Sequence, residues 1–173
     1  MRDPVVRFLT LGALGYLAWY LLYELWLHPH GRLDAAVIDL LIRHSGAVLQ
    51  ALGYDLIPEP TNAEQIRTVG VQGGHLLWIG DPCNGVGLFA VFSLFILAFP
   101  GPWKHKAWFI PLGLLSIHLI NVLRIVALCI VVTIDYELLN FNHDYTFYVI
   151  VYGWVFLLWW AWVRYFPLRA TPA

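Results

Sequence analysis

Long apolar stretches alternate with polar ones along the chain, and four of them approach the length of a membrane span. The first covers residues 5–27, and the second, residues 85–99, is shorter. The third and fourth cover residues 107–134 and 146–166. Because a membrane-spanning helix needs about 20 residues, this pattern predicts an all-α integral membrane protein with a bundle of about four transmembrane helices.

The segment between the first two apolar stretches has structure of its own. Residues 34–52 have the periodicity of an amphipathic helix, with Asp34 as the expected N-cap and Gly53 as the stop. A helix in the interface plane is our interpretation, although a re-entrant or spanning segment fits too. Residues 65–71 and 75–80 are rich in β-branched and aromatic residues and flank a Gln-Gly-Gly turn, which predicts a small outer β-hairpin.

These elements predict one membrane domain over residues 1–173. Its parts are an N-terminal anchor (1–27), an extracytoplasmic loop (28–82) and core helices (83–166). The first apolar stretch is longer than the apolar core of a signal peptide and has no small-residue cleavage site, so we expect an uncleaved anchor.

The basic residues predict the orientation. With four spans, three groups of Lys and Arg fall on one side of the membrane: Arg2 and Arg7, Lys104 and Lys106, and Arg164 and Arg169. Because cytoplasmic loops carry an excess of Lys and Arg, both termini are predicted to be cytoplasmic. The opposite side, which receives residues 28–84 and 135–145, is acidic.

The composition supports a membrane protein and argues against several other classes. Hydrophobic residues make up 60% of the chain and charged residues 12%, with a mean hydropathy of +0.69. Soluble domains carry about 25% charged residues. No basic cluster suits a nucleic acid. Two cysteines are too few for a disulfide scaffold. Only His28 and His30 are closely spaced as metal ligands, and a proline separates them, so we expect no metal and no cofactor.

Candidate chemistry begins with Cys83, in the stretch Gly-Asp-Pro-Cys-Asn-Gly at the outer end of the second span. Arg124 lies inside the third span, where a charge costs on the order of 3 kcal/mol and suggests a function. Asn121 and His118 precede it at intervals of three residues, so they form a polar face on an apolar helix. That face is expected to turn inward.

His143 lies at the outer end of the fourth span, on the same side as Cys83. A thiolate can attack a carbonyl, an imidazole can move the proton, and a guanidinium can stabilise the oxyanion. Together Cys83, Arg124 and His143 predict an acyl-transfer site that faces outward. Asn84, Asn121 and Asp144 are expected to support it.

Each residue also has an ordinary explanation. Cys83 alone reads as an inert loop thiol, Arg124 as half of an ion pair and His143 as a solvated histidine. His75 and His118 compete for the role of base, and Cys129 reads as packing in an aliphatic run. The shared side of the membrane favours the functional interpretation.

These residues resemble the exosortase/archaeosortase family of multi-pass membrane transpeptidases. The resemblance rests on Pro-Cys-Asn-Gly-Val-Gly (82–87), Asn-Val-Leu-Arg-Ile-Val (121–126) and His143, and it covers about residues 64–166. It implies that Cys83, Arg124 and His143 are catalytic. It also implies cleavage of a C-terminal sorting signal on exported proteins, made of a short motif, a transmembrane helix and a basic tail. The new carboxyl end would pass to an acceptor.

The expected function is therefore that of a membrane cysteine peptidase or transpeptidase at the outer face of a bacterial inner membrane. Its expected partners are the substrate protein, the lipid bilayer and a polysaccharide-export or accessory membrane protein, but no nucleic acid. Two alternatives remain open. One is a non-catalytic module that binds sorting helices or scaffolds an export complex, and the other is a thiol-redox protein, for which the second cysteine is badly placed.

Overall fold

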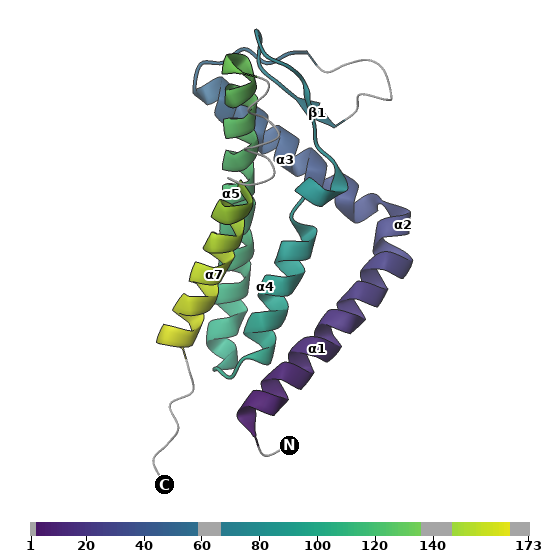
Figure 1. Ribbon diagram of the computed structural model, residues 1–173, viewed down its shortest axis with the longest axis vertical. Helices are drawn as coiled ribbons and strands as arrows, with labels where there is room; N and C mark the ends of the chain where they lie inside the picture. The colour runs from purple at the N-terminus through teal and green to yellow at the C-terminus, as the bar shows by residue number, and fades with distance from the viewer. Residues whose placement is uncertain (1–2, 59–66, 136–146, 167–173) are drawn as a thin grey trace.

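The computed structural model describes residues 3–58, 67–135 and 147–166. In this part of the chain, four helices run roughly along the long axis of the molecule and another crosses them near one end (Figure 1). The four are α1 (Pro4–Leu22), α4 (Val86–Ala98), α5 (Trp103–Ile134) and α7 (Phe147–Tyr165), and the crossing helix is α3 (Arg32–Ala51).

Helix α1 starts at a cap and continues past its nominal end. The Val5 amide donates to Asp3 Oδ1 at 2.8 Å, which satisfies one of the free N–H groups of the first turn. After Leu22 the helix passes into a π-helical turn, η1 (Tyr23–Leu27), and a short α-helical turn, α2 (His28–His30). Gly31, with φ of 63°, then ends it and turns the chain into α3.

Among the described residues, two continuous helices are long and apolar enough to cross a membrane. They are Pro4–His30, with mean hydropathy 1.6, and Trp103–Ile134, with 2.4. Helices α4 and α7 are apolar but shorter. The mostly helical fold agrees with the predicted all-α membrane class, whereas the count of four spans stays a prediction. Pro111 lies inside α5 without interrupting it.

Helices α4, α5 and α7 pack through a cluster of mainly aromatic side chains. Its buried members are Phe92, Ile96, Phe109, Ile117, Val155 and Trp162. Gly113 of α5 provides the space for one of them, because a Cβ atom there would collide with the ring of Phe92. This cluster holds α4 against α5 and so fixes where the N-terminal end of α4 lies.

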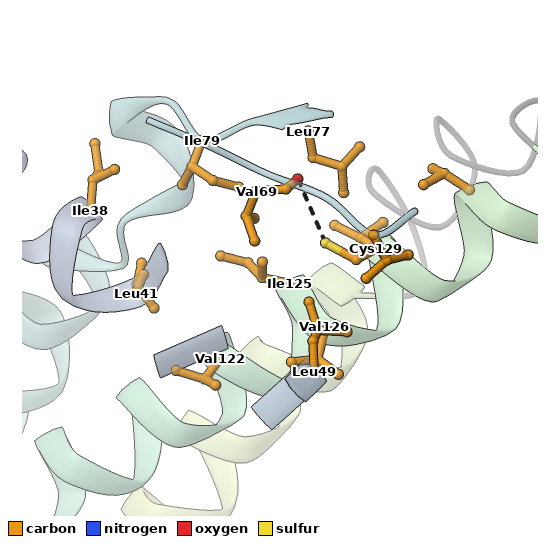
Figure 2. Close-up of a cluster of buried hydrophobic side chains, with 13 residues drawn as sticks. Ile38, Leu41, Leu49, Val69, Leu77, Ile79, Val122, Ile125, Val126 and Cys129 are labelled. Carbon is orange, nitrogen blue, oxygen red and sulfur yellow. Dashed lines mark hydrogen bonds between the residues drawn. The ribbon is translucent and has the colours of Figure 1, made fainter. Parts of the chain in front are cut away.

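A second, aliphatic cluster joins α3 and a β-hairpin to α5 (Figure 2). The hairpin pairs β1 (Thr68–Val69) with β2 (Leu77–Trp78) in antiparallel register, Thr68 opposite Trp78. It confirms the predicted hairpin, with shorter strands. Ile38 and Leu41 of α3 and Ile125 and Cys129 of α5 are buried in this cluster. The hairpin leads the chain back to the start of α4.

Helix α3 differs from its prediction at one end. It begins at Arg32 after the left-handed Gly31, so Asp34 is not the N-cap but lies in the first turn with a 1% exposed side chain. The predicted N-cap was wrong, because the left-handed turn at Gly31 starts the helix earlier and makes Gly31 the N-cap. Asp39, Arg43 and Gln50 are exposed, as the amphipathic pattern predicts. How α3 lies relative to a bilayer stays a prediction.

Three of the basic residues lie toward one end of the molecule. The start of α1, the start of α5 and the end of α7 lie together at one end, and α3 and the hairpin lie toward the other (Figure 1). Arg7 lies near the start of α1, Lys106 in the first turn of α5 and Arg164 in the last turn of α7. The arrangement agrees with the predicted grouping, and the assignment of that end to the cytoplasm stays a prediction.

Candidate active site

Cys83 sits in a tight turn directly before α4. Asp81–Cys83 form a 3-10 turn, η3, in which the Cys83 amide donates to the Gly80 carbonyl at 2.9 Å. Asn84 Oδ1 then accepts from the Val86 amide at 2.8 Å, and Gly85 takes the left-handed conformation with φ of 82°. A proline, a capping amide and a glycine therefore place the thiol at the N-terminal end of α4.

The polar face of α5 meets this turn from the side. Asn121 Nδ2 donates to the Cys83 carbonyl at 2.8 Å, and Arg124 Nη2 lies 3.9 Å from Cys83 Sγ. Residues three apart share a helix face, so both side chains reach the same turn. The structure brings together Cys83, Arg124 and Asn121, as the sequence predicts.

His118, the third residue of that face, points elsewhere. Its Nε2 lies 2.9 Å from Nδ1 of His44 on α3, and the two rings meet edge to face. His75 is exposed in the connection between the two strands. His143 and Asp144 lie outside the described residues, so their predicted places beside Cys83 stay predictions.

A cavity of about 730 Å³ opens beside the turn. Its walls come from four helices: aromatic residues of α1 and α7 on two sides, the first turns of α4 and the polar face of α5. Pro82, Asn84 and Arg124 line it, and so does Gly87, whose Cα faces open space. The Cys83 turn therefore borders this cavity through Pro82 and Asn84.

Sequence reasoning missed a second polar group next to the first. The buried carboxylate of Asp34 accepts hydrogen bonds at Oδ1 from Tyr23 at 2.8 Å and from Asn84 Nδ2 at 2.6 Å. His28 Nδ1 lies 3.3 Å from Oδ2. The signal that could have found this group was a pair of polar residues, Tyr23 and His28, at the end of an apolar span.

Part of this group could hold a metal. Among the described residues, His28, Asp34 and Asp81 have ligand atoms within 4.8 Å of one another. One His nitrogen and two carboxylates are suitable donors for a divalent ion. Three hydrogen-bonding neighbours already occupy the Asp34 carboxylate, however, and Asp81 Oδ1 lies 3.7 Å from Arg67 Nη1. The arrangement is explained without an ion.

A model of the transmembrane exosortase family matches residues 5–165. The chain belongs to this family. The sequence resemblance is thereby confirmed, and in this exosortase family member the match extends beyond the core helices to include the anchor and α3. Neither curated proteins nor solved structures gave a match.

Proposed function

We propose that this exosortase family member is a membrane cysteine peptidase or transpeptidase, with Cys83 as nucleophile. The observation that carries the proposal is the approach of Arg124 Nη2 to Cys83 Sγ, 3.9 Å, at the edge of a cavity of about 730 Å³. A guanidinium stays charged and donates in a fixed plane, so it can stabilise negative charge on sulfur and on a carbonyl oxygen.

The reaction is proposed in two steps. The Cys83 sulfur attacks the scissile carbonyl, its proton goes to His143, and Arg124 donates to the oxyanion. His143 then protonates the leaving amine as the peptide bond breaks, and the acyl group stays on Cys83 as a thioester. Water or an acceptor amine attacks the thioester, gives up its proton to His143 and releases the thiol.

The substrate in this proposal is an exported protein with a C-terminal sorting signal: a short motif, a transmembrane helix and a basic tail. The cavity supports this because its walls are helices of the membrane bundle and its floor includes Gly87, which leaves space for another backbone. The proposed setting is the outer face of a bacterial inner membrane, with both termini in the cytoplasm and an accessory or polysaccharide-export protein as a further partner.

The test is co-expression with epitope-tagged exported proteins of the host that end in such signals. Wild type should shorten a reporter, whereas Cys83→Ser should leave it at full length while the variant stays in the membrane. Mass spectrometry of the peptide that contains residue 83 should detect the acyl adduct on wild type after rapid acid quenching. Processing by Cys83→Ser at the wild-type rate would support the binding-module alternative and overturn the proposal.

A further inference from the structure

We infer that Asp34 is a positioning residue for the active site and that it acts through Asn84. The inference rests on the proposed function for its catalytic consequence, but its structural part stands on the contacts of Asp34 alone. Asp34 and Asn84 are 50 residues apart in sequence, and both are buried, with exposed fractions of 1% and 2%.

The Asn84 side chain has two fixed partners. Its Nδ2 donates to Asp34 Oδ1 at 2.6 Å, and its Oδ1 accepts from the Val86 amide at 2.8 Å. An amide that donates on one side and accepts on the other has only one orientation that satisfies both. Asp34 therefore fixes the Asn84 side chain against the first amide of α4, and Asn84 is the residue that follows Cys83.

Asp34 in turn is held from a different part of the chain. Tyr23 and His28, in the last turns of the first helix, reach its two oxygens. A carboxylate buried without such donors would be strongly disfavoured. Its location in the first turn of α3 also places negative charge at the positive end of a helix. The carboxylate thus ties together the end of the first helix, the start of α3 and the Cys83 turn.

Two neighbouring residues of the turn are therefore held by different helices. Asn121 holds the Cys83 carbonyl from α5, and Asp34 holds the neighbouring Asn84 from α3. The Cys83 sulfur can attack efficiently only if its position relative to the substrate carbonyl is kept. A small displacement of a reacting group can lower the rate by up to about a hundredfold. Loss of Asp34 should loosen one side of the turn while leaving Cys83 and Arg124 chemically intact.

The first experiment needs no substrate. Hydrogen–deuterium exchange of the full chain in detergent should show faster exchange in a peptide covering residues 80–89 for Asp34→Ala, by on the order of tenfold, because Asn84 loses the acceptor that fixes its side chain against the Val86 amide. Asp39→Ala is the matched control, because it removes the same side chain from an exposed position of the same helix. It should leave that peptide unchanged. An unchanged peptide in Asp34→Ala would overturn the inference even if the peptidase proposal holds.

A swap tests the route through Asn84. Asn84→Asp keeps the oxygen that accepts from Val86 but places a carboxylate against that of Asp34, so exchange should rise. The double variant Asp34→Asn/Asn84→Asp restores an amide-to-carboxylate pair with its polarity reversed, and it should recover most of the wild-type protection. If the loss of protection in the double variant equals the sum of the losses in the two single variants, the two residues do not act together and the inference fails.

The catalytic consequence is measured on a processed reporter. Asp34→Ala should lower kcat about tenfold or more and leave KM within about twofold, because the substrate cavity remains while the sulfur is displaced. The double variant Asp34→Asn/Asn84→Asp should recover the kcat that Asn84→Asp alone loses. A rise in KM alone would contradict positioning. Chelation with EDTA should change neither exchange nor kcat in wild type; a loss equal to that of Asp34→Ala would instead make Asp34 a metal ligand.

Discussion

Cys83 contacts α5 through Asn121 and Arg124, whereas Cys129 is part of α5. Both cysteines touch the aliphatic cluster, Cys83 at its edge and Cys129 inside it, and their other neighbours differ. Cys83 is partly exposed, in a polar turn at the edge of a cavity, with Arg124 Nη2 3.9 Å from its sulfur. Cys129 is fully buried in the aliphatic cluster, and its thiol donates weakly to the Val69 carbonyl at 3.8 Å (Figure 2). The reactivity of a thiol depends on such neighbours, so only Cys83 is suited to nucleophilic attack.

One helix serves both regions because its faces differ. Asn121 and Arg124 project toward the Cys83 turn, and Ile125 and Cys129 project into the cluster under α3 and the hairpin. The aliphatic face packs α5 against α3 and the hairpin. This packing holds the polar face of α5 beside the Cys83 turn. Because Cys83 touches the cluster only at its edge, we expect a change inside the cluster to lower stability more than it alters the chemistry of the site.

The largest expected difference in reporter processing is between substitutions of the two cysteines. Cys83→Ala should abolish reporter processing, because it removes the sulfur that lies beside Arg124. Cys129→Ala removes only a buried thiol and should cost about 1 kcal/mol of the free energy of unfolding while processing continues. Immunoblots of the reporter, together with thermal unfolding in detergent, measure both. Loss of processing in Cys129→Ala at unchanged stability would break the contrast.

Arg124→Lys should reduce the rate of processing by roughly 10²–10³, comparable to the loss of one oxyanion-hole donor. Lysine keeps the charge but not the planar set of donors. Leu123→Ala is a control on the same turn of α5, since Leu123 is 55% exposed. Single-turnover processing gives the rates. If Arg124→Lys works as well as wild type, charge alone suffices and the donor geometry is irrelevant.

Ile125→Ala should act on the cluster and leave the site chemistry unchanged. Ile125 is 2% exposed, and truncating a buried isoleucine costs roughly 2–5 kcal/mol. The thermal midpoint should fall, while alkylation of Cys83 by iodoacetamide at low temperature keeps its wild-type rate. A changed alkylation rate in the folded variant would mean that the two regions are coupled through α5.

Gly85→Ala and Gly87→Ala make the smallest and most local comparison. Gly85 has φ of 82°, and a Cβ there would lie 3.3 Å from Asn121 Nδ2, so alanine should cost about 1–2 kcal/mol. Gly87 has open space around its Cα and ordinary helical geometry, so alanine should leave the thermal midpoint unchanged or slightly higher. Equal midpoints for the two variants would contradict the strained turn.

Much of the fold follows from local patterns. Apolar runs predicted the helices, and the Gln-Gly-Gly turn predicted the hairpin, because helix and hairpin signals lie within a few residues. The approach of Cys83 to Arg124 was also foreseeable, since a charge within an apolar helix needs a polar neighbour. The place of His143 beside them stays a prediction.

Asp34 shows where such reasoning ends. Its local sequence suits an N-cap. The pattern shows that Tyr23 and His28 are polar residues at the end of an apolar span, but not that they and Asn84 meet Asp34 in three dimensions. The number of spans has the same limitation. Helix α4 has 13 residues, fewer than the about 20 a span needs, and apolar composition does not reveal where a helix ends.

The π-helical turn η1 has a consequence for the side chains that follow it. In a regular α-helix, with 3.6 residues per turn, positions five apart point about 140° away from each other. In η1 the His28 amide bonds to the Tyr23 carbonyl instead, the i→i+5 pattern of a wider turn, which brings the fifth residue round to nearly the same direction. The rings of Tyr23 and His28 accordingly lie 5.3 Å apart, centre to centre. If residues 23–28 were wound as a regular α-helix instead, the phenol and the imidazole would point about 140° apart and could not both reach Asp34.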